Sequence, residues 1–184
     1  MAKEKIVKYY FPILIVIAIL FAGLEIAVAK TTIKVAVVMP DGSPWTSSLR
    51  NMASEIEKQT AGEIKFIIYA GGVSGDEVDV IRKMQVNRIH AAGFSGVGLG
   101  ILLPKIRILE APMLYRNYEE IDLVKEKLYN EFSEDFAKRG YVLLGFVEAG
   151  FVYFFSKKNM SGHDGLKNIR MWVWKSDTVA KTTF

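Results

Sequence analysis

The sequence predicts an α/β fold with open sheets, and two observations carry this prediction. Residues 63–81 (EIKFIIYAGGVSGDEVDVI) have the pattern of a strand, a glycine-rich turn and a helix. The strand part is β-branched, aromatic and largely apolar on both faces, which is typical of a strand covered by helices on both sides. Residues 32–39 (TIKVAVVM) form a second such run ahead of another helical pattern. Alternating strands and helices of this kind indicate parallel β-α-β units.

The turn after residues 64–69 lies at the carboxyl edge of the predicted sheet. Gly71 and Gly72 allow the backbone to turn where a Cβ would clash. Ser74 and Glu77 have the spacing of a capping box, so we expect Ser74 to begin the next helix. Backbone amides then point out of the carboxyl edge of the sheet, where open α/β sheets bind their ligands.

The first 29 residues have the features of a secretory signal peptide. Three lysines occur within the first ten residues, an uncharged apolar run covers residues 11–24, and Ala27 and Ala29 are spaced as a signal peptidase requires. We expect cleavage after Ala29 and a periplasmic mature protein. The alternative is a retained membrane anchor, and against it the apolar run is shorter than the about 20 residues that a spanning helix needs.

Composition narrows the class of protein further. The chain has 184 residues and 51% hydrophobic content, which is ample for a core. Cleavage would remove three lysines and two glutamates, lowering the formal net charge from +4 to +3. The basic residues are dispersed, which argues against a nucleic-acid partner. The chain has no cysteine, so a disulfide scaffold and a lipid-modified cysteine are both excluded.

The remaining elements follow in chain order. Ser43 as N-cap and Pro44 at the first helical position begin a helix that ends at Gly62. Beyond the second helix we expect a short strand at 89–92 and a glycine-rich loop at 93–100. We expect no long helix between Pro104 and Pro112, and one or two helices over 118–140. The last part of the chain should contain strands at 141–147, 151–156 and 169–174, and a further helix beginning near the last residue.

An enzymatic alternative rests on residues 93–97. Their sequence, GFSGV, approaches the nucleophile elbow G-x-S-x-G, but Val97 replaces the last glycine. A serine hydrolase also needs a histidine base, and the two histidines are His90 in the adjoining strand and His163 in a polar segment. The nearby glycines do not match the dinucleotide fingerprint, and two distant histidines without cysteine argue against zinc. We therefore expect no enzyme, no cofactor and no metal.

The order of these motifs resembles that of the solute-binding proteins of TRAP (tripartite ATP-independent periplasmic) transporters. The resemblance is carried by IKVAVVMPDGSPW, EIKFIIYAGGVSGDEVDVIRKM, LEAPMLYRNYEEID, GYVLLGFVEAGFVYFFSKK and GLKNIRMWVW. It implies a periplasmic-binding-protein-like fold in which two lobes close on a small molecule. Such proteins are roughly twice as long as the mature chain. We therefore expect a first lobe at 30–147, a crossover and the start of the second lobe at 148–184, and an incomplete second lobe.

The resemblance also implies a function. The chain would be the extracytoplasmic component that captures an organic solute and delivers it to the membrane permease subunits of a TRAP transporter. Such capture involves no chemical reaction. The lobes close because the solute binds the closed state more tightly than the open state. Two alternatives stay open beside it: that the sequence is a fragment of a longer protein, and that it is a non-functional truncated copy.

Two departures from the family pattern bear on the solute. Many members bind a carboxylate through an arginine that follows an LKG-L-K-I pattern, since a guanidinium pairs with a carboxylate in two-pronged fashion. Here Trp172 stands at that position, with Arg170 two residues earlier on the same face of a strand. Val152 stands where a second arginine often follows the hinge glycine. The resemblance therefore implies a solute with more apolar surface and less charge than a dicarboxylate.

The candidate site contains both apolar and polar side chains. We expect Trp172, Trp174, Phe151 and Trp45 to enclose the solute, although Trp172 and Trp174 could equally alternate with Val173 in a core. Polar side chains and residues near the carboxyl edge of the sheet complete the candidate solute-binding site. Its residues are Trp45, Val73, Glu77, Phe94, Ser95, Glu148, Phe151, Arg170, Trp172 and Trp174. Two of these residues have an ordinary structural role as the alternative to ligand contact: Glu77 could cap a helix, and Glu148 could be a solvated hinge residue.

Overall fold

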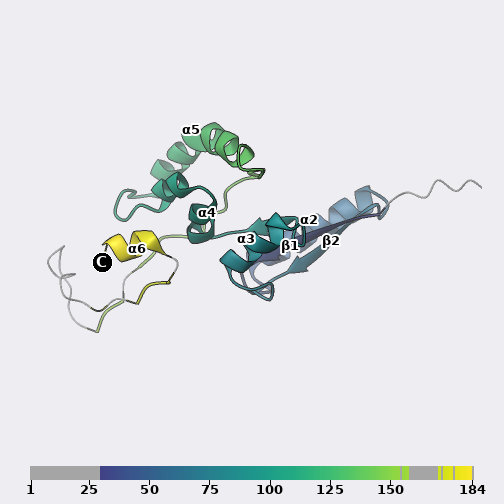
Figure 1. The fold of residues 1–184 in the computed structure, drawn as a ribbon, viewed down its shortest axis with the longest axis horizontal. Helices are drawn as coiled ribbons and strands as arrows, with labels where there is room; N and C mark the ends of the chain where they lie inside the picture. The colour runs from purple at the N-terminus through teal and green to yellow at the C-terminus, as the bar shows by residue number, and fades with distance from the viewer. Residues whose placement is uncertain (1–29, 154, 158–169, 171, 176, 184) are drawn as a thin grey trace, which may run out of the picture.

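The computed structural model describes residues 30–153, 155–157, 170, 172–175 and 177–183 (Figure 1). The predicted signal peptide lies outside these residues, and so does His163. Within the described part of the chain, no helix is both long enough and apolar enough to cross a membrane.

A three-stranded parallel sheet organises the N-terminal part of the chain. The central strand is β1 (Thr31–Val37), flanked by β2 (Ile64–Tyr69) and β3 (Ala91–Gly93). Strand β1 pairs with β2 from Thr31 opposite Ile64 to Ala36 opposite Tyr69, and with β3 from Val35 opposite Ala91 to Val37 opposite Gly93. The three strands expected in this region are confirmed. Because all three are parallel, their carboxyl ends meet at one edge.

Helix α2 (Pro44–Gln59) covers one face of the sheet. The Ser43 side chain accepts a hydrogen bond from the amide of Thr46 at 3.3 Å, and Pro44 occupies the first turn, as the sequence predicted. Leu49 packs against a cluster that contains Val35 and Val37 of β1. Two left-handed residues end the helix, Ala61 at φ +49° and Gly62 at φ +82°. The Gly62 amide donates to the Glu57 carbonyl at 2.8 Å and the Ala61 amide donates to the Lys58 carbonyl at 3.1 Å, which satisfies carbonyls of the last turn.

Helix α3 (Glu77–Gln85) covers the opposite face, where Val80 packs with Ala36 of β1 and with Ile89. β1 is therefore covered on both sides. For β2 the same expectation is only partly met: Phe66 and Ile68 pack against the cluster under α2, but Ile67 on the other face is 41% exposed. The reason is that β2 is an edge strand of the sheet formed by the described residues.

The predicted start of α3 is wrong by two residues. Asp76, and not Ser74, is the N-cap, and its carboxylate accepts from the amide of Asp79 at 2.9 Å. The reason is Gly75, whose φ of +94° is incompatible with a helix that includes it. Ser74 is instead buried in the turn, where its carbonyl accepts a hydrogen bond from the Lys83 ammonium at 2.6 Å. The predicted capping box between Ser74 and Glu77 does not form.

Three helical elements follow the sheet. The glycine-rich segment expected to be a loop forms α4 (Gly96–Leu102), with Ser95 as N-cap. Next come the 3₁₀ helix η1 (Pro104–Glu110), which confirms the absence of a long helix here, and the single long helix α5 (Tyr118–Ala137). Figure 1 shows α4 between the sheet and α5. A second core joins these elements to α3, built from Ile81, Leu102, Leu103, Ile106, Phe132 and Phe136.

The C-terminal part departs most from expectation. Residues 141–153 and the described residues of 155–156 and 169–174 form no strand, although strands were predicted there. The alternation is present only over residues 141–144, where Tyr141 and Leu143 pack against the second core and Val142 and Leu144 are 81% and 82% exposed. Phe146 also packs against this core, although strand alternation would place it on the other face. What is missing among the described residues is a neighbouring strand to supply hydrogen-bond partners. A final helix, α6 (Thr178–Thr183), is present as expected.

Candidate functional site

A small hollow lies at the carboxyl edge of the sheet, where β1 and β3 end and α3 begins. Two of the predicted site residues, Glu77 and Phe94, line it. Val73 lies in the adjoining turn and is 73% exposed. The full lining consists of Ala36, Val37, Val38, Gly72, Ser74, Gly75, Glu77, Val80, Gly93 and Phe94. The predicted location of a site at this edge therefore coincides with a concave surface.

Glu77 connects this hollow to the start of α4. Its Oε1 accepts a hydrogen bond from the Ser95 amide at 2.5 Å, and its Oε2 accepts from the Ser95 hydroxyl at 2.8 Å and from the Gly98 amide at 3.1 Å. A helix N-terminus attracts negative charge because its first amides lack partners within the helix. Glu77 therefore supplies that negative charge from within the protein.

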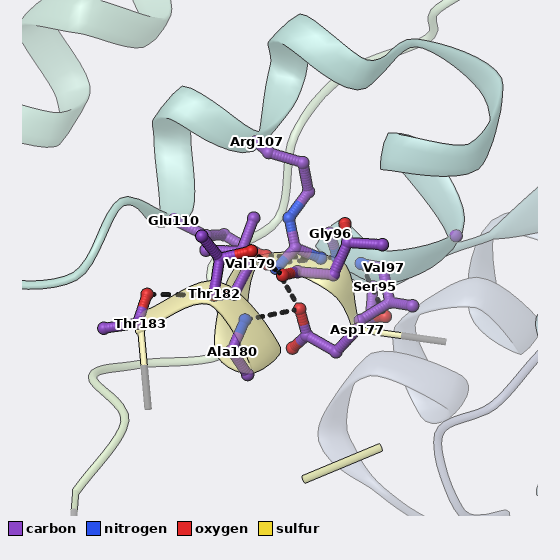
Figure 2. Close-up of polar contacts among 12 residues, drawn as sticks. Ser95, Gly96, Val97, Arg107, Glu110, Asp177, Val179, Ala180, Thr182 and Thr183 are labelled. Atoms are coloured by element: carbon purple, nitrogen blue, oxygen red, sulfur yellow. Dashed lines mark hydrogen bonds and ion pairs between the residues drawn. The ribbon is translucent and has the colours of Figure 1, made fainter. Parts of the chain in front are cut away.

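A second carboxylate reaches the same helix end (Figure 2). Glu110 Oε1 accepts a hydrogen bond from the Gly96 amide at 3.0 Å. A Cβ at Gly96 would lie 1.9 Å from the Glu110 carboxyl carbon, so a side chain at Gly96 would displace this contact. The amides of Ser95, Gly96 and Gly98 are thus all bonded to carboxylates of the protein.

Arg107 and Asp177 form a largely buried ion pair beside this helix end (Figure 2). Arg107 Nη2 donates to Asp177 Oδ1 at 2.8 Å, and the two side chains are 13% and 12% exposed. Asp177 Oδ1 also accepts from the Ala180 amide at 3.1 Å, which caps α6. Arg107 Nη1 lies 3.4 Å from Glu110 Oε2. Arg107 Nε is buried and has no hydrogen-bond partner among the described residues.

Arg107 is not among the residues that the sequence pattern singles out. It lies within residues 101–113, a mostly apolar run in which the sequence pattern draws attention only to Pro104 and Pro112 as helix breakers. A signal was available, because an arginine inside such a run is unusual: arginine is rarely fully buried unless it is paired. Its partner Asp177 lies 70 residues further along the chain, so sequence spacing could not reveal the pair.

The other predicted residues are not among those that line the hollow. Trp45 is 40% exposed in the first turn of α2. Glu148 and Phe151 lie against α5. Glu148 pairs with Lys125, and the Phe151 ring lies 5.0 Å from that of Tyr118. Partial burial opposes the charge on Lys125, but hydrogen bonds to Asp122 and Glu148 outweigh it and raise its pKa.

The C-terminal candidates lie near α6. Arg170 is exposed, and Trp172 and Trp174 are 74% and 62% exposed, so the described residues do not bury the two indoles in a core. The two indole rings contact each other edge to face, with centroids 4.8 Å apart. The Trp174 carbonyl accepts a hydrogen bond from the Asp177 amide at 3.0 Å, which places Trp174 one turn before the ion pair with Arg107.

The geometry around Ser95 does not favour a serine nucleophile. Its hydroxyl donates to Glu77, and His90 Nδ1 accepts from the Lys34 amide at 3.1 Å. Among the described residues, no group of three histidine, aspartate or glutamate side chains could hold a metal ion.

Parallel strands with a helix on each face and a small hollow at the carboxyl edge define an open α/β domain, a class of fold that binds ligands at this edge. Comparison with known proteins narrows this class. The family model for bacterial extracellular solute-binding protein, family 7, matches residues 35–183. The chain therefore belongs to that family, which confirms the resemblance inferred from its motifs.

Relatives of known sequence agree with this assignment. The chain is 26% identical over 148 residues to a solute-binding protein of Verminephrobacter eiseniae, covering 79% of this chain and 44% of that protein. It is 27% identical over 171 residues to an uncharacterised protein of Haemophilus influenzae, covering 92% and 51%. The chain thus spans about half or less of the length of these relatives.

Solved structures agree on the fold. A TRAP periplasmic solute-binding protein from Pseudomonas putida F1 with bound D-glucuronate is 25% identical, with a TM-score of 0.52 over 58% of this chain and 35% of that one. A TRAP solute-binding protein from Sulfitobacter sp. NAS-14.1 gives a TM-score of 0.60 at 19% identity, over 65% and 40%. These matches are consistent with a two-lobed fold of which this chain holds part.

Proposed function

We propose that this chain captures an organic solute outside the cytoplasm and presents it to the membrane permease of a TRAP transporter. The observation that carries the proposal is the hollow at the carboxyl edge of the sheet, in a chain that belongs to a solute-binding family. The Pseudomonas relative with bound D-glucuronate supports an organic acid as the chemical class. Capture by closure of two lobes requires no covalent chemistry.

The proposed solute carries little charge and a substantial apolar surface. Trp172 and Val152 stand where many members have carboxylate-binding arginines, and both are largely exposed, at 74% and 88%. Exposed indoles provide a large contact area for an apolar ligand. In this proposal residues 30–147 supply the first lobe and residues 148–184 begin the second.

A thermal-shift panel on the purified chain tests both parts of the proposal. The probes are succinate, malate, D-glucuronate, benzoate and octanoate, with benzamide and D-glucose as uncharged counterparts. We expect benzoate or octanoate to raise the unfolding temperature in a concentration-dependent way. Stabilisation by succinate or malate alone would contradict the proposed solute class, and stabilisation by no compound would contradict solute capture by this chain.

Export is tested separately. We propose that residues 1–29 direct the chain to the periplasm and are removed there. N-terminal sequencing of the protein from the periplasmic fraction should begin at Lys30. A sequence beginning at Met1, recovered with the membrane fraction, would instead support a retained anchor.

A further inference from the structure

Asp177 is the only buried residue among the described residues that follow Phe136. Trp172 and Trp174, which lie shortly before it, are largely exposed, and the helix that it begins, α6, contains no buried residue. A surface helix is usually held against a domain by burial of an apolar face. In this part of the chain a carboxylate is buried in place of such a face.

The ion pair with Arg107 connects α6 to the earlier part of the chain. Figure 2 shows Asp177 at the start of α6 directed toward Arg107, whose Nη2 donates to Asp177 Oδ1 at 2.8 Å across 70 residues of sequence. The other hydrogen bonds of α6 that involve described residues stay within residues 174–183. Among the described residues, this pair is therefore the one polar contact that α6 makes with a distant element.

The two partners of this ion pair differ in how firmly they are held. Arg107 belongs to η1, whose Ile106 is buried in the second core. The Arg107 side chain also lies over Gly100, where a Cβ would come within 2.6 Å of Arg107 Cδ. Asp177, by contrast, begins a helix of only six residues. Helices shorter than about 12 residues are marginal in water on their own, so α6 depends on its docking to stay helical.

The geometry of the pair is suited to a reversible contact. The attraction between two buried opposite charges is largely offset by their loss of hydration. Here the bond to Arg107 uses one oxygen that also accepts from the Ala180 amide, and it leaves Arg107 Nε without a partner among the described residues. Glu110 Oε2 lies 3.4 Å from Arg107 Nη1. Departure of Asp177 therefore leaves the guanidinium beside a second carboxylate, and not as an unpaired buried charge.

We propose that Arg107 and Asp177 form a releasable latch that fastens α6 to η1. In the latched state α6 is docked and helical, and in the released state it leaves η1 and loses its helical structure. The assignment of η1 to a first lobe and of α6 to a second lobe rests on the proposed function. In that setting the latch favours the arrangement in which the two lobes are in contact. The latch itself requires no solute.

Amide hydrogen exchange of the full chain, measured without solute, tests the latch. In the natural chain the amides of α6 should be protected, but they should exchange faster than those of β1 and α5, because the latch opens without global unfolding. Asp177→Asn should speed exchange in α6 by about 10-fold or more and leave β1 unchanged. Asparagine caps a helix about as well as aspartate, so this change reports the loss of the ion pair and not of the cap.

Substitution of the partner completes the test. Arg107→Gln should speed exchange in α6 to a similar degree, and the double variant should add little, because each single change already removes the same contact. The exposed ion pair of α3 provides matched controls, Asp79→Asn and Arg82→Gln, which should leave exchange in α6 unchanged. If Arg107→Gln does not fold, Asp177→Asn decides alone.

Three results would overturn the latch. Exchange in α6 of the natural chain at the rate of an unstructured peptide would show that α6 is not docked. Equal opening free energies in α6, β1 and α5 would make α6 an integral part of the fold. Unchanged exchange of α6 in Asp177→Asn would show that the ion pair does not hold it. Failure of every compound in the thermal-shift panel would instead remove the lobe assignment and leave the latch standing.

Discussion

Glu77 holds Ser95 at both its amide and its hydroxyl, at 2.5 and 2.8 Å. One carboxylate at the start of α3 therefore fixes the first turn of α4, which lies beyond the end of β3. Since Glu77 also lines the hollow, the same side chain shapes the site and anchors the helix behind it. A solute that approached these amides would have to compete with Glu77.

Removing the Glu77 carboxylate should destabilise the chain. Glu77→Ala leaves the Ser95 and Gly98 amides without their acceptor, and we expect the free energy of unfolding to fall by about 1–3 kcal/mol. Urea unfolding monitored by circular dichroism measures the change. Glu126→Ala, at an exposed position of α5, is the control and should have a small effect. Equal effects of the two substitutions would show that the contacts of Glu77 contribute no net stability.

The N-terminal half of the fold was predictable because its signals are local. Ser43 and Pro44 mark the start of α2, and the apolar runs mark β1 and β2. α4 was missed because four glycines in eight residues have low helix propensity, and propensity is a weak guide where tertiary contacts dominate. The carboxylates that hold this helix come from Glu77 and Glu110, which no local pattern connects to it.

The candidate site was predictable only at the sheet edge. Glu77 and Phe94 line the hollow because parallel topology brings the ends of β1 and β3 together. Glu148 and Phe151 instead contact side chains of α5, a pairing of distant segments that periodicity does not encode. The first strand expected beyond residue 140 alternates only over residues 141–144. A strand also requires a neighbour, which the sequence of the strand itself does not specify.

Gly98 should not tolerate a side chain. Replacing glycine by alanine inside a helix normally gains about 1 kcal/mol. At Gly98, however, a Cβ would lie 2.7 Å from Phe94 Cδ1 and 2.9 Å from the Glu77 carboxyl carbon. We therefore expect Gly98→Ala to destabilise the chain by about 1–3 kcal/mol, measured by thermal or urea unfolding. Gly145→Ala, outside any helix, controls for the loss of a glycine without a steric clash, because nothing lies within 4 Å of its Cβ position. A gain in stability at Gly98 would contradict the close packing described here.

Asp135 should make stability depend on pH in the acid range. Hydrogen bonds from Lys105 and Lys138 lower its pKa from 3.8 to about 2. A carboxyl group whose pKa is lower in the folded state stabilises the fold at pH values above its unfolded pKa, and this contribution is lost as pH falls through the folded pKa. The difference in urea midpoint between the natural chain and Asp135→Asn should therefore shrink between about pH 4 and pH 2.

Salt provides the control for this assignment. The two lysines are 40% and 71% exposed, so high ionic strength should reduce the difference between the natural chain and Asp135→Asn near neutral pH. A difference that stayed constant from pH 7 to pH 2 would show that the substitution acts through packing or helix propensity and not through the charge.

Phe94 joins two otherwise separate cores. Its ring packs against the cluster of Ala36, Val80 and Ile89 on the sheet, and also against the second core that contains Phe132. Cooperative unfolding requires that the parts of a domain lose their structure together. We expect Phe94→Ala to lower stability by about 2–4 kcal/mol and also to uncouple the two parts, so that amide hydrogen exchange in β1 and in α5 reports different opening free energies.

Phe132→Ala distinguishes this coupling from a general loss of core packing. Phe132 is 2% exposed and belongs to the second core alone, so its truncation should cost about 3–5 kcal/mol and lower protection mainly in α5. Phe94→Ala should instead increase the difference in opening free energy between β1 and α5, with a smaller total loss of stability. If the most protected amides of β1 and α5 lost equal protection in Phe94→Ala, contacts other than Phe94 would have to carry the coupling, with the Glu77 bridge to α4 as the next candidate.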